Sequence, residues 1–590
     1  MNLDFSKCRT VPVYQDDGSV AAMPPPPHVR AGVAWLAGRP YGMNGNDMGG
    51  MKSATAIIAA QFMFEAGMID RAILVAPAPV RSSVWYDPEI GELALHLRDD
   101  LPSQVSEFHR KIRKWTRGDQ SAPRIFKWIV TNYEWLRGRG DKVATLQQYC
   151  GPRTVLILDE SSSVRSFDSA QTQAILRLRW AEGRRGSLAI GQPRCGYAWL
   201  LNGTPLAEGP EDLFAQGLVM HPLIHGCRYI THFRNRYAIM EGVRGSGGQA
   251  ILDKRGKPVM HVAGWQHLEE LQAAFAPHVL RQDWRRDFPL PGVLPTQTIE
   301  VAMSADEWAA YRDMRDDMVH WLADGNVGVA RHAAVKVMRL AQITSGLLGG
   351  LEGDVEAPAL DNAELLASLG LESNKIDLPG SFLDGVELEP SGLDALLAQR
   401  AHLFAPRDIA EIGRSKLDAL LDLQAHLLRE DPNTKLLIWF KFVPELRRWH
   451  AAAGERFPGL ALGSVCGEPI SGRPVREERA SAMRLLHPRT APPGPAAVGG
   501  TYGTGGLGLN FTAFSTVVHC SHVYEDWKRR QAEKRVDRPG QRNVVTQFDL
   551  MATGPRGQRT IDHVILEARR KKQDLNDWTV AAWIRALKEE

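Results

Sequence analysis

Val155 to Glu160 reads VLILDE, an apolar run that ends in two carboxylates. A short, uninterrupted apolar run is typical of a strand that is buried on both faces of a parallel sheet. Ligands of such sheets bind at the carboxyl ends of the strands, which is where Asp159 and Glu160 stand. There Asp159 can hold Mg²⁺, and Glu160 can orient and deprotonate an attacking water. An acidic turn after a buried strand is the alternative that this segment alone leaves open.

Similar apolar runs occur on both sides of this segment and predict two parallel sheets. The first set is 72–76 (AILVA), 125–130 (IFKWIV), 155–158 (VLIL) and 197–201 (YAWLL), and the second set is 436–440 (LLIWF), 460–464, 516–519 and 544–550. Helix-like stretches separate these runs, as expected of a sheet covered on both faces. We therefore predict an α/β fold with two parallel-sheet lobes.

A Gly-rich segment precedes the helix that we expect to start near Ala54. Asn46 to Ser53 reads NDMGGMKS. Phosphate binding at a helix N-terminus needs a turn with accessible backbone N–H groups, a Lys that reaches the β/γ oxygens, and a Ser or Thr hydroxyl for Mg²⁺. Lys52 and Ser53 fit this pattern, whereas Met51 stands where Gly is usual. A Gly-rich surface turn is the alternative.

Three further motifs follow downstream. They are LNGTPL at 201–206, GGLGLN at 505–510 and QAEKRVDRPGQ at 531–541. Arg535 and Arg538 lie about one helical turn apart, so that they can project together. Two arginines there suit an anionic transition state. For the last motif, a basic, solvated helix is the alternative.

In this order the motifs resemble those of the Swi/Snf-type ATPases, a branch of the superfamily-two helicase-like proteins that translocate on duplex DNA. The family's DEMGLGKT corresponds to NDMGGMKS, its DEAH box to Asp159–Ser162, and its TGTP to Asn202–Pro205. Further matches are Val75–Pro77 with Trp85, Thr131–Glu134 for TSYE, Leu280-Arg281 with Leu294-Pro295, Ser415–Leu417 for SKL, and the intact QAxxRxxRxGQ of 531–541. The resemblance covers roughly residues 26–575.

The resemblance implies two RecA-like lobes with helical protrusions and an inter-lobe insert, and ATP with Mg²⁺ bound between the lobes. The implied catalytic residues are Glu160, Gln531, Arg535 and Arg538, and the implied Mg²⁺ ligands are Ser53 and Asp159. The implied nucleotide contacts are Asp47, Met48, Gly49, Gly50, Met51, Lys52, Ser53 and Gly508. The implied contacts to the DNA phosphate backbone are Ser82, Ser83, Asn132, Lys441, Thr501 and Thr504. Phosphate contacts carry no sequence information, so little sequence specificity is expected.

The chain departs from the family pattern at three places. Met51 replaces a loop Gly, which puts nucleotide affinity in question. Ser162 replaces the His of the DEAH box, which puts the coupling between lobes in question. The adenine-reading Gln is absent, and Val29 sits near its place.

The predicted organisation has five parts. They are an N-terminal tail (1–24), a first lobe that binds ATP (25–225), a helical protrusion and linker (226–350), an acidic insert (351–412), and a second lobe with C-terminal helices (413–590). The run Pro24 to Pro27 should stiffen the entry to the first lobe without forming a helix. The insert is either a solvated segment or an autoinhibitory flap that mimics DNA.

Composition excludes several classes of protein. The chain has 590 residues, of which 44% are hydrophobic and 24% charged, with a formal net charge of +3, so it is neither a disordered chain nor a fibre. Six scattered cysteines argue against a disulfide framework or a structural zinc site. The apolar run at 56–64 is too short to span a bilayer, so we expect a cytoplasmic protein without membrane contact. Because the motifs leave little sequence unassigned, we expect a minimal bacterial or bacteriophage form acting in the bacterial or infected host cell.

The sequence therefore predicts an ATP-dependent motor that binds and translocates on double-stranded DNA. The QAxxRxxRxGQ motif favours this function over a strand-separating DNA or RNA helicase. A catalytically weak nucleic-acid-binding module is a third hypothesis, in which Met51 and the missing Gln indicate a loss of catalytic function. The retained Lys52, Asp159 and Glu160 argue against it.

Overall fold

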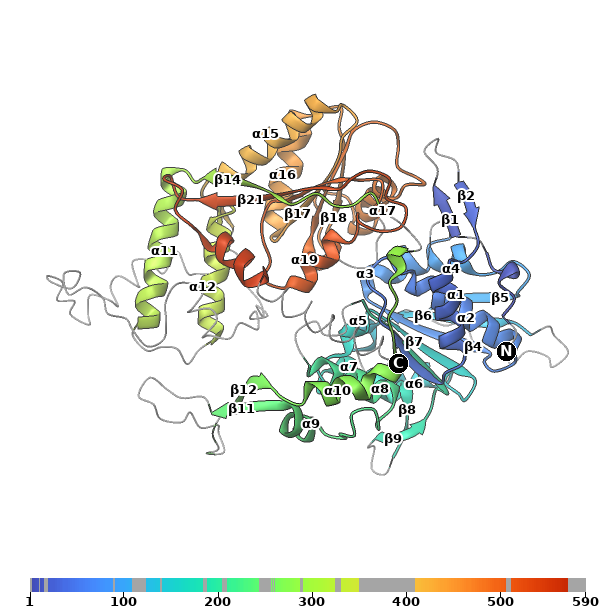
Figure 1. Cartoon of the computed structure of the whole chain (residues 1–590). Helices are drawn as coiled ribbons and strands as arrows, with labels where there is room; N and C mark the ends of the chain where they lie inside the picture. Colours follow the sequence, from blue (N-terminus) through green and yellow to red (C-terminus); the bar gives the residue numbers. More distant parts are fainter. Residues whose placement is uncertain are drawn as a thin grey trace.

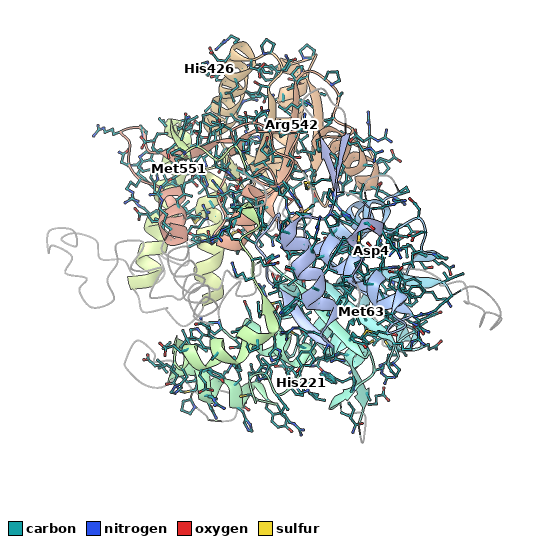
Figure 2. The ribbon with its side chains drawn as sticks, turned by 45° about the vertical axis from the view of Figure 1, so that its right-hand side comes forward. Asp4, Met63, His221, His426, Arg542 and Met551 are labelled. Atoms are coloured by element: carbon teal, nitrogen blue, oxygen red, sulfur yellow. The ribbon has the colours of Figure 1, made fainter. Side chains whose placement is uncertain are left out.

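The structure is a computed structural model with two sheet-containing lobes (Figure 1). It describes residues 3–9, 11–14, 20–88, 91–108, 124–137, 141–183, 188–203, 210–242, 256, 258, 260–286, 290–323, 330–349, 409–505 and 511–570. Figure 2 shows Met63 inside the first lobe and His426 at the far end of the second lobe. The insert predicted at 351–412 lies outside the described residues except for its last four positions.

Lobe 1 contains a seven-stranded sheet in the order β13-β3-β10-β7-β4-β6-β5, in which every neighbouring pair is parallel. Its strands are β3 (Tyr41–Asn44), β4 (Arg71–Ala76), β5 (Ser103–Glu107), β6 (Phe126–Asn132), β7 (Thr154–Asp159), β10 (Tyr197–Leu201) and β13 (Val279–Leu280). Alternate residues of the central strand β7 enter opposite cores, with Val155 and Ile157 in one and Leu156 and Leu158 in the other. This is why its apolar run is unbroken.

Helices cover both faces of this sheet. Helices α1 (Pro27–Ala37) and α2 (Lys52–Glu65) pack into the core that contains Val155. Helices α5 (Tyr133–Leu136), α6 (Asp141–Gln147), α7 (Ala170–Arg179) and α8 (Asp212–Met220) pack into the core that contains Leu156. The expectation that Pro24 to Pro27 excludes a helix is wrong at its last residue: Pro27 begins α1, at the position where a missing N–H costs nothing.

Short elements extend lobe 1. The predicted N-terminal tail includes a hairpin of β1 (Val11–Tyr14) and β2 (Val20–Met23). The strands β8 (Trp180–Glu182) and β9 (Leu188–Pro193) form another antiparallel pair. The small elements α3 (Ala78–Val80), η2 (Arg81–Trp85) and α4 (Glu92–His96) lie between β4 and β5.

The segment predicted as a helical protrusion contains both helices and strands. Helices α9 (Ile230–Tyr237) and α10 (Leu268–Phe275) flank an antiparallel pair of β11 (Ala238–Gly242) and β12 (Met260–Trp265). Strand β12 ends at Trp265, and α10 begins at Leu268. Two longer helices, α11 (Ala305–Ala323) and α12 (Ala330–Ile343), share a core with lobe 2 residues such as Ile561 and Ile565.

Lobe 2 contains a six-stranded sheet in the order β14-β21-β20-β17-β19-β18, again parallel throughout. Its strands are β14 (Gln297–Ala302), β17 (Lys435–Phe440), β18 (Ala461–Val465), β19 (Ala496–Thr501), β20 (Thr516–His519) and β21 (Thr546–Thr553). The helices of lobe 2 include α15 (Ser415–Glu430), α16 (Val443–Arg456), α17 (Val475–Leu486), α18 (Tyr502–Gly505) and α19 (Asp526–Glu533). The edge strand β14 comes from the predicted linker, so the chain enters this sheet before the insert. The predicted α/β class with two parallel-sheet lobes is confirmed.

The described residues contain neither a membrane-spanning helix nor a cluster of metal-ligating side chains. None of their helices combines the length and the hydropathy needed to cross a bilayer. Within the same residues, no group of three or more His, Cys, Asp or Glu side chains is placed to hold a metal ion.

Candidate active site

The predicted phosphate loop joins the end of β3 to the start of α2. Its glycine Gly49 adopts a positive φ of 86°, and the N–H of Gly50 donates to the carbonyl of Asp47 at 3.0 Å. Asp47 Oδ1 accepts from the N–H of Met48 at 2.8 Å, which fixes the turn. The first N–H groups of α2 have no partner within the helix, so they form an anion-binding end.

Met51 is the N-cap of α2 and adopts a left-handed conformation, with φ 51° and ψ 40°. Glycine adopts this region freely, whereas a side chain with a Cβ pays about 1–2 kcal/mol for it. Thr55 helps to hold the turn, because both its N–H and its hydroxyl donate to the Met51 carbonyl, at 3.0 and 2.9 Å. The Gly of the similar Swi/Snf motif could adopt this left-handed conformation without strain. In this chain Met51 adopts it under strain.

Lys52 points back at the loop. Its Nζ donates to the carbonyls of Asn46 at 2.9 Å and Asp47 at 3.3 Å. Burial lowers the pKa of Lys52, although the nearby carboxylates of Glu160, Asp47 and Asp159 oppose that shift. A Cβ placed on Gly203 would lie 3.3 Å from this Nζ, so the NGTP motif after β10 also reaches the loop.

Asp159 ends β7 and is buried. Its Oδ2 accepts a hydrogen bond of 2.7 Å from Trp85 Nε1, and its carbonyl accepts one of 2.9 Å from Tyr133 Oη. Burial, assisted by the neighbouring Glu160 carboxylate, raises the pKa of Asp159 to about 7, while Trp85 and Lys52 act in the opposite direction. This carboxyl is therefore poised to change charge near neutral pH.

Glu160 is the second non-glycine residue of the site with a positive φ, at 48°. Its N–H donates to Asp159 Oδ1 at 3.1 Å, and its carbonyl accepts from the N–H of Ser163 at 2.9 Å. Left-handed residues of this kind cost about 1–3 kcal/mol and cluster at functional sites. Here the strain lies on the residue that we expect to act as the base.

Arg535 and Arg538 bring lobe 2 to this site. They do not share a helix as expected: α19 ends at Glu533, and the arginines lie in the turns that follow it. Burial lowers the pKa of Arg535 to about 9; Arg538 adds repulsion, and Glu160 and Asp159 oppose it. Burial likewise lowers the pKa of Arg538, against the attraction of Glu92 and Glu160. Both guanidinium groups thus lie within electrostatic reach of lobe 1 carboxylates.

A buried amide links the acidic motif to the NGTP motif. Ser161 Oγ donates to Gln216 Oε1 at 2.7 Å, and Asn202 Nδ2 donates to the same oxygen at 3.3 Å. Gln216 lies on α8, where its Nε2 donates to the Asp212 carbonyl at 2.9 Å. Gln216 could not be predicted from the sequence, because no local pattern marks it. Trp85 and Tyr133 lie within predicted motifs, but only the structure shows their hydrogen bonds to Asp159.

The structure describes no contact between the residues above and the predicted site residues Gln531, Gly508, Ser82, Ser83 and Thr504. Gln531 lies buried on α19, and its Nε2 has no hydrogen-bond partner among the described residues. Gly508 lies outside the described residues, as do the side chains of Ser82, Ser83 and Thr504. These assignments therefore stay predictions.

Three of the predicted DNA contacts have buried side-chain groups. Asn132 caps α5 by accepting from the N–H of Trp135 at 2.6 Å. Thr501, at the end of β19, is buried. Lys441 has a buried Nζ over the rings of Phe442 and Tyr524, and burial lowers its pKa to about 8. None of the three presents its polar group on the surface in this conformation.

The basic side chains of Lys528–Arg530 form ion pairs with carboxylates of lobe 2. Lys528 pairs with Glu525 at 2.7 Å, and Arg530 pairs with Asp526 at 2.7 Å. Arg529 is buried between Glu533 and Asp549, at 2.6 and 2.7 Å. The three cations are therefore engaged in ion pairs within lobe 2 in this conformation.

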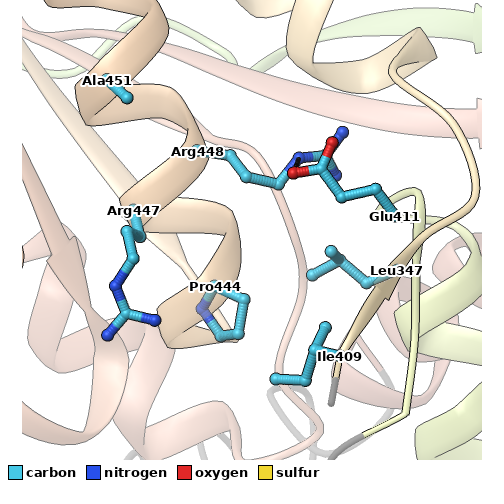
Figure 3. Close-up of a pocket in the computed structure, with 7 residues that line it drawn as sticks. All are labelled: Leu347, Ile409, Glu411, Pro444, Arg447, Arg448 and Ala451. Atoms are coloured by element: carbon cyan, nitrogen blue, oxygen red, sulfur yellow. Dashed lines mark ion pairs between the residues drawn. The ribbon is translucent and has the colours of Figure 1, made fainter.

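A cavity of about 500 Å³ lies elsewhere in lobe 2 (Figure 3). It is lined by Leu347, Ile409, Glu411, Pro444, Arg447, Arg448 and Ala451. Arg448 pairs with Glu411 at 3.2 Å across it. None of these residues belongs to the predicted site, so the cavity is separate from the phosphate loop.

Comparisons with known proteins found local and weak similarities. No protein-family model matches the chain. A stretch of 76 residues, 13% of the chain, is 40% identical to the chromatin-remodeling ATPase INO80 of two Cryptococcus neoformans strains, B-3501A and JEC21, and spans only 4% of the length of those proteins.

Two solved structures are also similar. They are the SWI2/SNF2 ATPase core of Sulfolobus solfataricus in complex with dsDNA, at 15% identity, and the core domain alone, at 14%. Each comparison covers 92% of this chain and 89% or 90% of the other, with a TM-score of 0.33. The 40% identity to INO80 supports the resemblance to Swi/Snf-type ATPases and says nothing of a bacterial or bacteriophage origin.

Proposed function

We propose that the protein is an ATP-dependent motor that binds and translocates on double-stranded DNA, and that it hydrolyses ATP between its two lobes. The observation that carries the proposal is the meeting of two sets of residues. Lys52, Asp159 and Glu160 come from lobe 1, and Arg535 and Arg538 come from lobe 2. A site that needs both lobes can couple nucleotide chemistry to their relative movement.

The charges of the site fit a bound nucleotide. Burial lowers the pKa of Lys52, Arg535 and Arg538 alike, so holding three cations here is unfavourable without an anion. The loop also packs too closely for a side chain at Gly50, because a Cβ there would lie 2.8 Å from the Asn46 Cβ. The phosphates of ATP would meet these cations and the N–H groups at the start of α2.

The same residues fit Mg²⁺ and a general base. Ser53 in the first turn of α2 and the Asp159 carboxylate would hold the ion, which neutralises phosphate charge when bound. Glu160 would hold the attacking water and take its proton on the carboxylate. Arg535 and Arg538 would stabilise the charge that develops on the transferred phosphoryl group.

The DNA substrate rests on the motif resemblance and on the local similarity to INO80, which is named as a chromatin-remodeling ATPase. A catalytically weak binding module is the second candidate. Two observations favour it: Met51 is strained, and the Lys52 ammonium is engaged by loop carbonyls.

One set of assays separates these functions. Phosphate release from ATP should rise with duplex DNA and fall steeply with added salt, because the contacts are to phosphates. Lys52→Ala should abolish turnover and weaken binding of a fluorescent ATP analogue. Lys435→Ala is the control, because the Nζ of Lys435 donates to the Pro492 carbonyl in lobe 2. This variant should retain both ATP turnover and binding of the analogue. Absence of turnover with intact DNA binding would favour the weak module, and efficient unwinding of a fork or stimulation by RNA alone would favour a helicase.

A further inference from the structure

The segment that leaves lobe 1 is fastened to the phosphate loop. Strand β13 pairs with β3, and the N–H of Gly45 donates to the Leu280 carbonyl at 2.8 Å. Gln282 donates its N–H to Asn46 Oδ1 at 2.8 Å and accepts from Asn46 Nδ2 at 3.3 Å. Residues 279–286 therefore belong structurally to lobe 1.

Trp284, in this segment, lies on the loop glycines. Its side chain is buried, and a Cβ on Gly49 or Gly50 would lie 2.9 or 3.0 Å from its ring. The same Cβ on Gly49 would lie 3.0 Å from Cδ of Pro539, which belongs to lobe 2. An aromatic ring of lobe 1 and a proline of lobe 2 thus contact one turn of the phosphate loop.

An ion pair stands beside this apolar contact. Arg285 Nη2 donates to Asp537 Oδ2 at 2.8 Å, and Asp537 also accepts from Lys534 Nζ at 2.9 Å. The Asp537 side chain is 5% exposed and the Arg285 side chain 39% exposed. Burial alone would raise the pKa of Asp537, but Lys534 and Arg285 more than offset it and keep this pKa below its usual value. The carboxylate is therefore charged and held from both lobes.

Asp537 lies between the two arginines of the site along the chain. We propose that Arg285 is a positioning residue: through Asp537 it holds Arg535 and Arg538 over the phosphate loop, with Trp284 and Pro539 as the apolar part of the same contact. Its effect on lobe closure stands on these contacts alone, whereas its effect on turnover rests on the proposed function.

The structural test measures the separation of the lobes without nucleotide. One dye is placed on Glu269→Cys of α10, whose Leu271 and Phe275 pack into the lobe 1 core, and the other on Glu430→Cys in lobe 2. In a Cys150→Ser background they report the separation by Förster transfer, because the other five cysteines are buried. Arg285→Gln should lower the closed population about threefold or more, within the range for a partly buried pair. Adding Asp537→Asn to that variant should lower the closed population little further, because the two residues act as one contact.

Arg286→Gln is the matched control. Its guanidinium pairs at 3.2 Å with Asp283 in the same segment, and its side chain is 75% exposed. This control should leave the lobe separation unchanged. An unchanged Förster distribution in Arg285→Gln, or an equal change in the control, would overturn the proposal.

The kinetic test uses the same variants. Arg285→Gln should lower kcat about threefold or more while KM for ATP and the affinity for ADP stay within twofold, because loop and lysine are untouched. A higher kcat would mean that the contact inhibits, and would overturn the positioning role. If the wild type itself hydrolyses no ATP, the proposed function fails, while the Förster measurement still decides the role of Arg285.

Discussion

Trp85 Nε1 donates a 2.7 Å hydrogen bond to Oδ2 of Asp159, and these residues are 74 positions apart in the chain. Because Asp159 is buried beside Glu160, this indole is a local group that favours the charged carboxylate. The bond thus links a turn after β4 to the charge state of the predicted Mg²⁺ ligand.

The first prediction concerns pH. Because folding raises the pKa of Asp159 from 3.8 to about 7, the native state binds this proton more tightly, and its stability should fall as pH rises through that window. Asp159→Asn removes the effect, so its thermal midpoint relative to wild type should increase from pH 5 to pH 8. Trp85→Phe loses the donor, so the pKa of Asp159 should rise further and Mg²⁺ affinity at pH 7 should fall.

Trp180→Phe is the control for the loss of a buried indole. Trp180 Nε1 donates to the Leu218 carbonyl at 3.0 Å, a group that does not titrate. This variant should be destabilised equally at all pH values between 5 and 8. If Trp85→Phe shows the same flat profile and unchanged Mg²⁺ affinity, the hydrogen bond does not control the charge of Asp159.

The second prediction concerns Glu160. Glu160→Gln keeps the shape of the side chain but removes the base, so ATP should stay bound while hydrolysis drops by about 10²-fold or more. Single-turnover hydrolysis and equilibrium binding of ATP measure the two effects separately. Glu182→Gln, on the exposed end of β8, should behave as wild type. A Glu160→Gln variant that cannot bind ATP would show a structural role, since the residue holds a strained backbone.

The third prediction concerns Met51. Met51→Gly relieves about 1–2 kcal/mol of left-handed strain but loses packing against the core of lobe 1 and about 0.5–1 kcal/mol of chain entropy. Its stability should therefore stay within about 1 kcal/mol of wild type. Met51→Val, with a branched Cβ at positive φ, should be clearly less stable. Thermal unfolding decides this, and equal midpoints for Gly and Val would show that the turn carries no strain.

Strands whose own side chains fill the core could be predicted from the sequence, whereas strands whose packing depends on side chains of neighbouring helices could not. VLIL at 155–158 is apolar on both faces, so its pattern is complete. Strand β19 reads AAVGGT, because a Cβ on Gly499 would lie 2.3 Å from Leu446 and 2.7 Å from Trp449 of α16. Strand β3 reads YGMN for the same reason: a Cβ on Gly42 would lie 2.7 Å from Trp35. Because small residues replace large apolar ones in both strands, hydrophobic periodicity does not predict them.

The site shows the same division. Lys52, Asp159 and the arginines lie in short motifs whose spacing is readable along the chain. The contacts that orient them join distant residues, such as Arg285 and Asp537, which are 252 positions apart. The prediction that one helical turn separates the two arginines is also wrong, because α19 ends at Glu533 and non-helical turns lead from there to Pro539 and Gly540. No local pattern contains these relationships.

The last prediction concerns Arg535 and Arg538 and tests the two-lobe mechanism. If they stabilise charge on the transferred phosphoryl group, they act mainly in the closed state, so ATP affinity should depend on them less than the rate does. Arg538→Ala, and to a similar degree Arg535→Ala, should keep ATP and DNA binding within about tenfold while turnover falls by ~10³–10⁵, the range for arginine fingers. Lysine at either position should rescue poorly, because it lacks the planar fork. Arg556→Ala, at an exposed turn of lobe 2, is the control and should be neutral.

The rival explanation is that both arginines only line a surface that touches DNA. It predicts the opposite division, with weakened DNA binding and ATPase activity that returns at high DNA concentration. The burial of Arg535 and the reach of both residues to Glu160 argue for the catalytic role. Titrating duplex DNA against each variant, with ATP turnover as the readout, distinguishes the two. Full turnover at saturating DNA would remove both residues from the catalytic site.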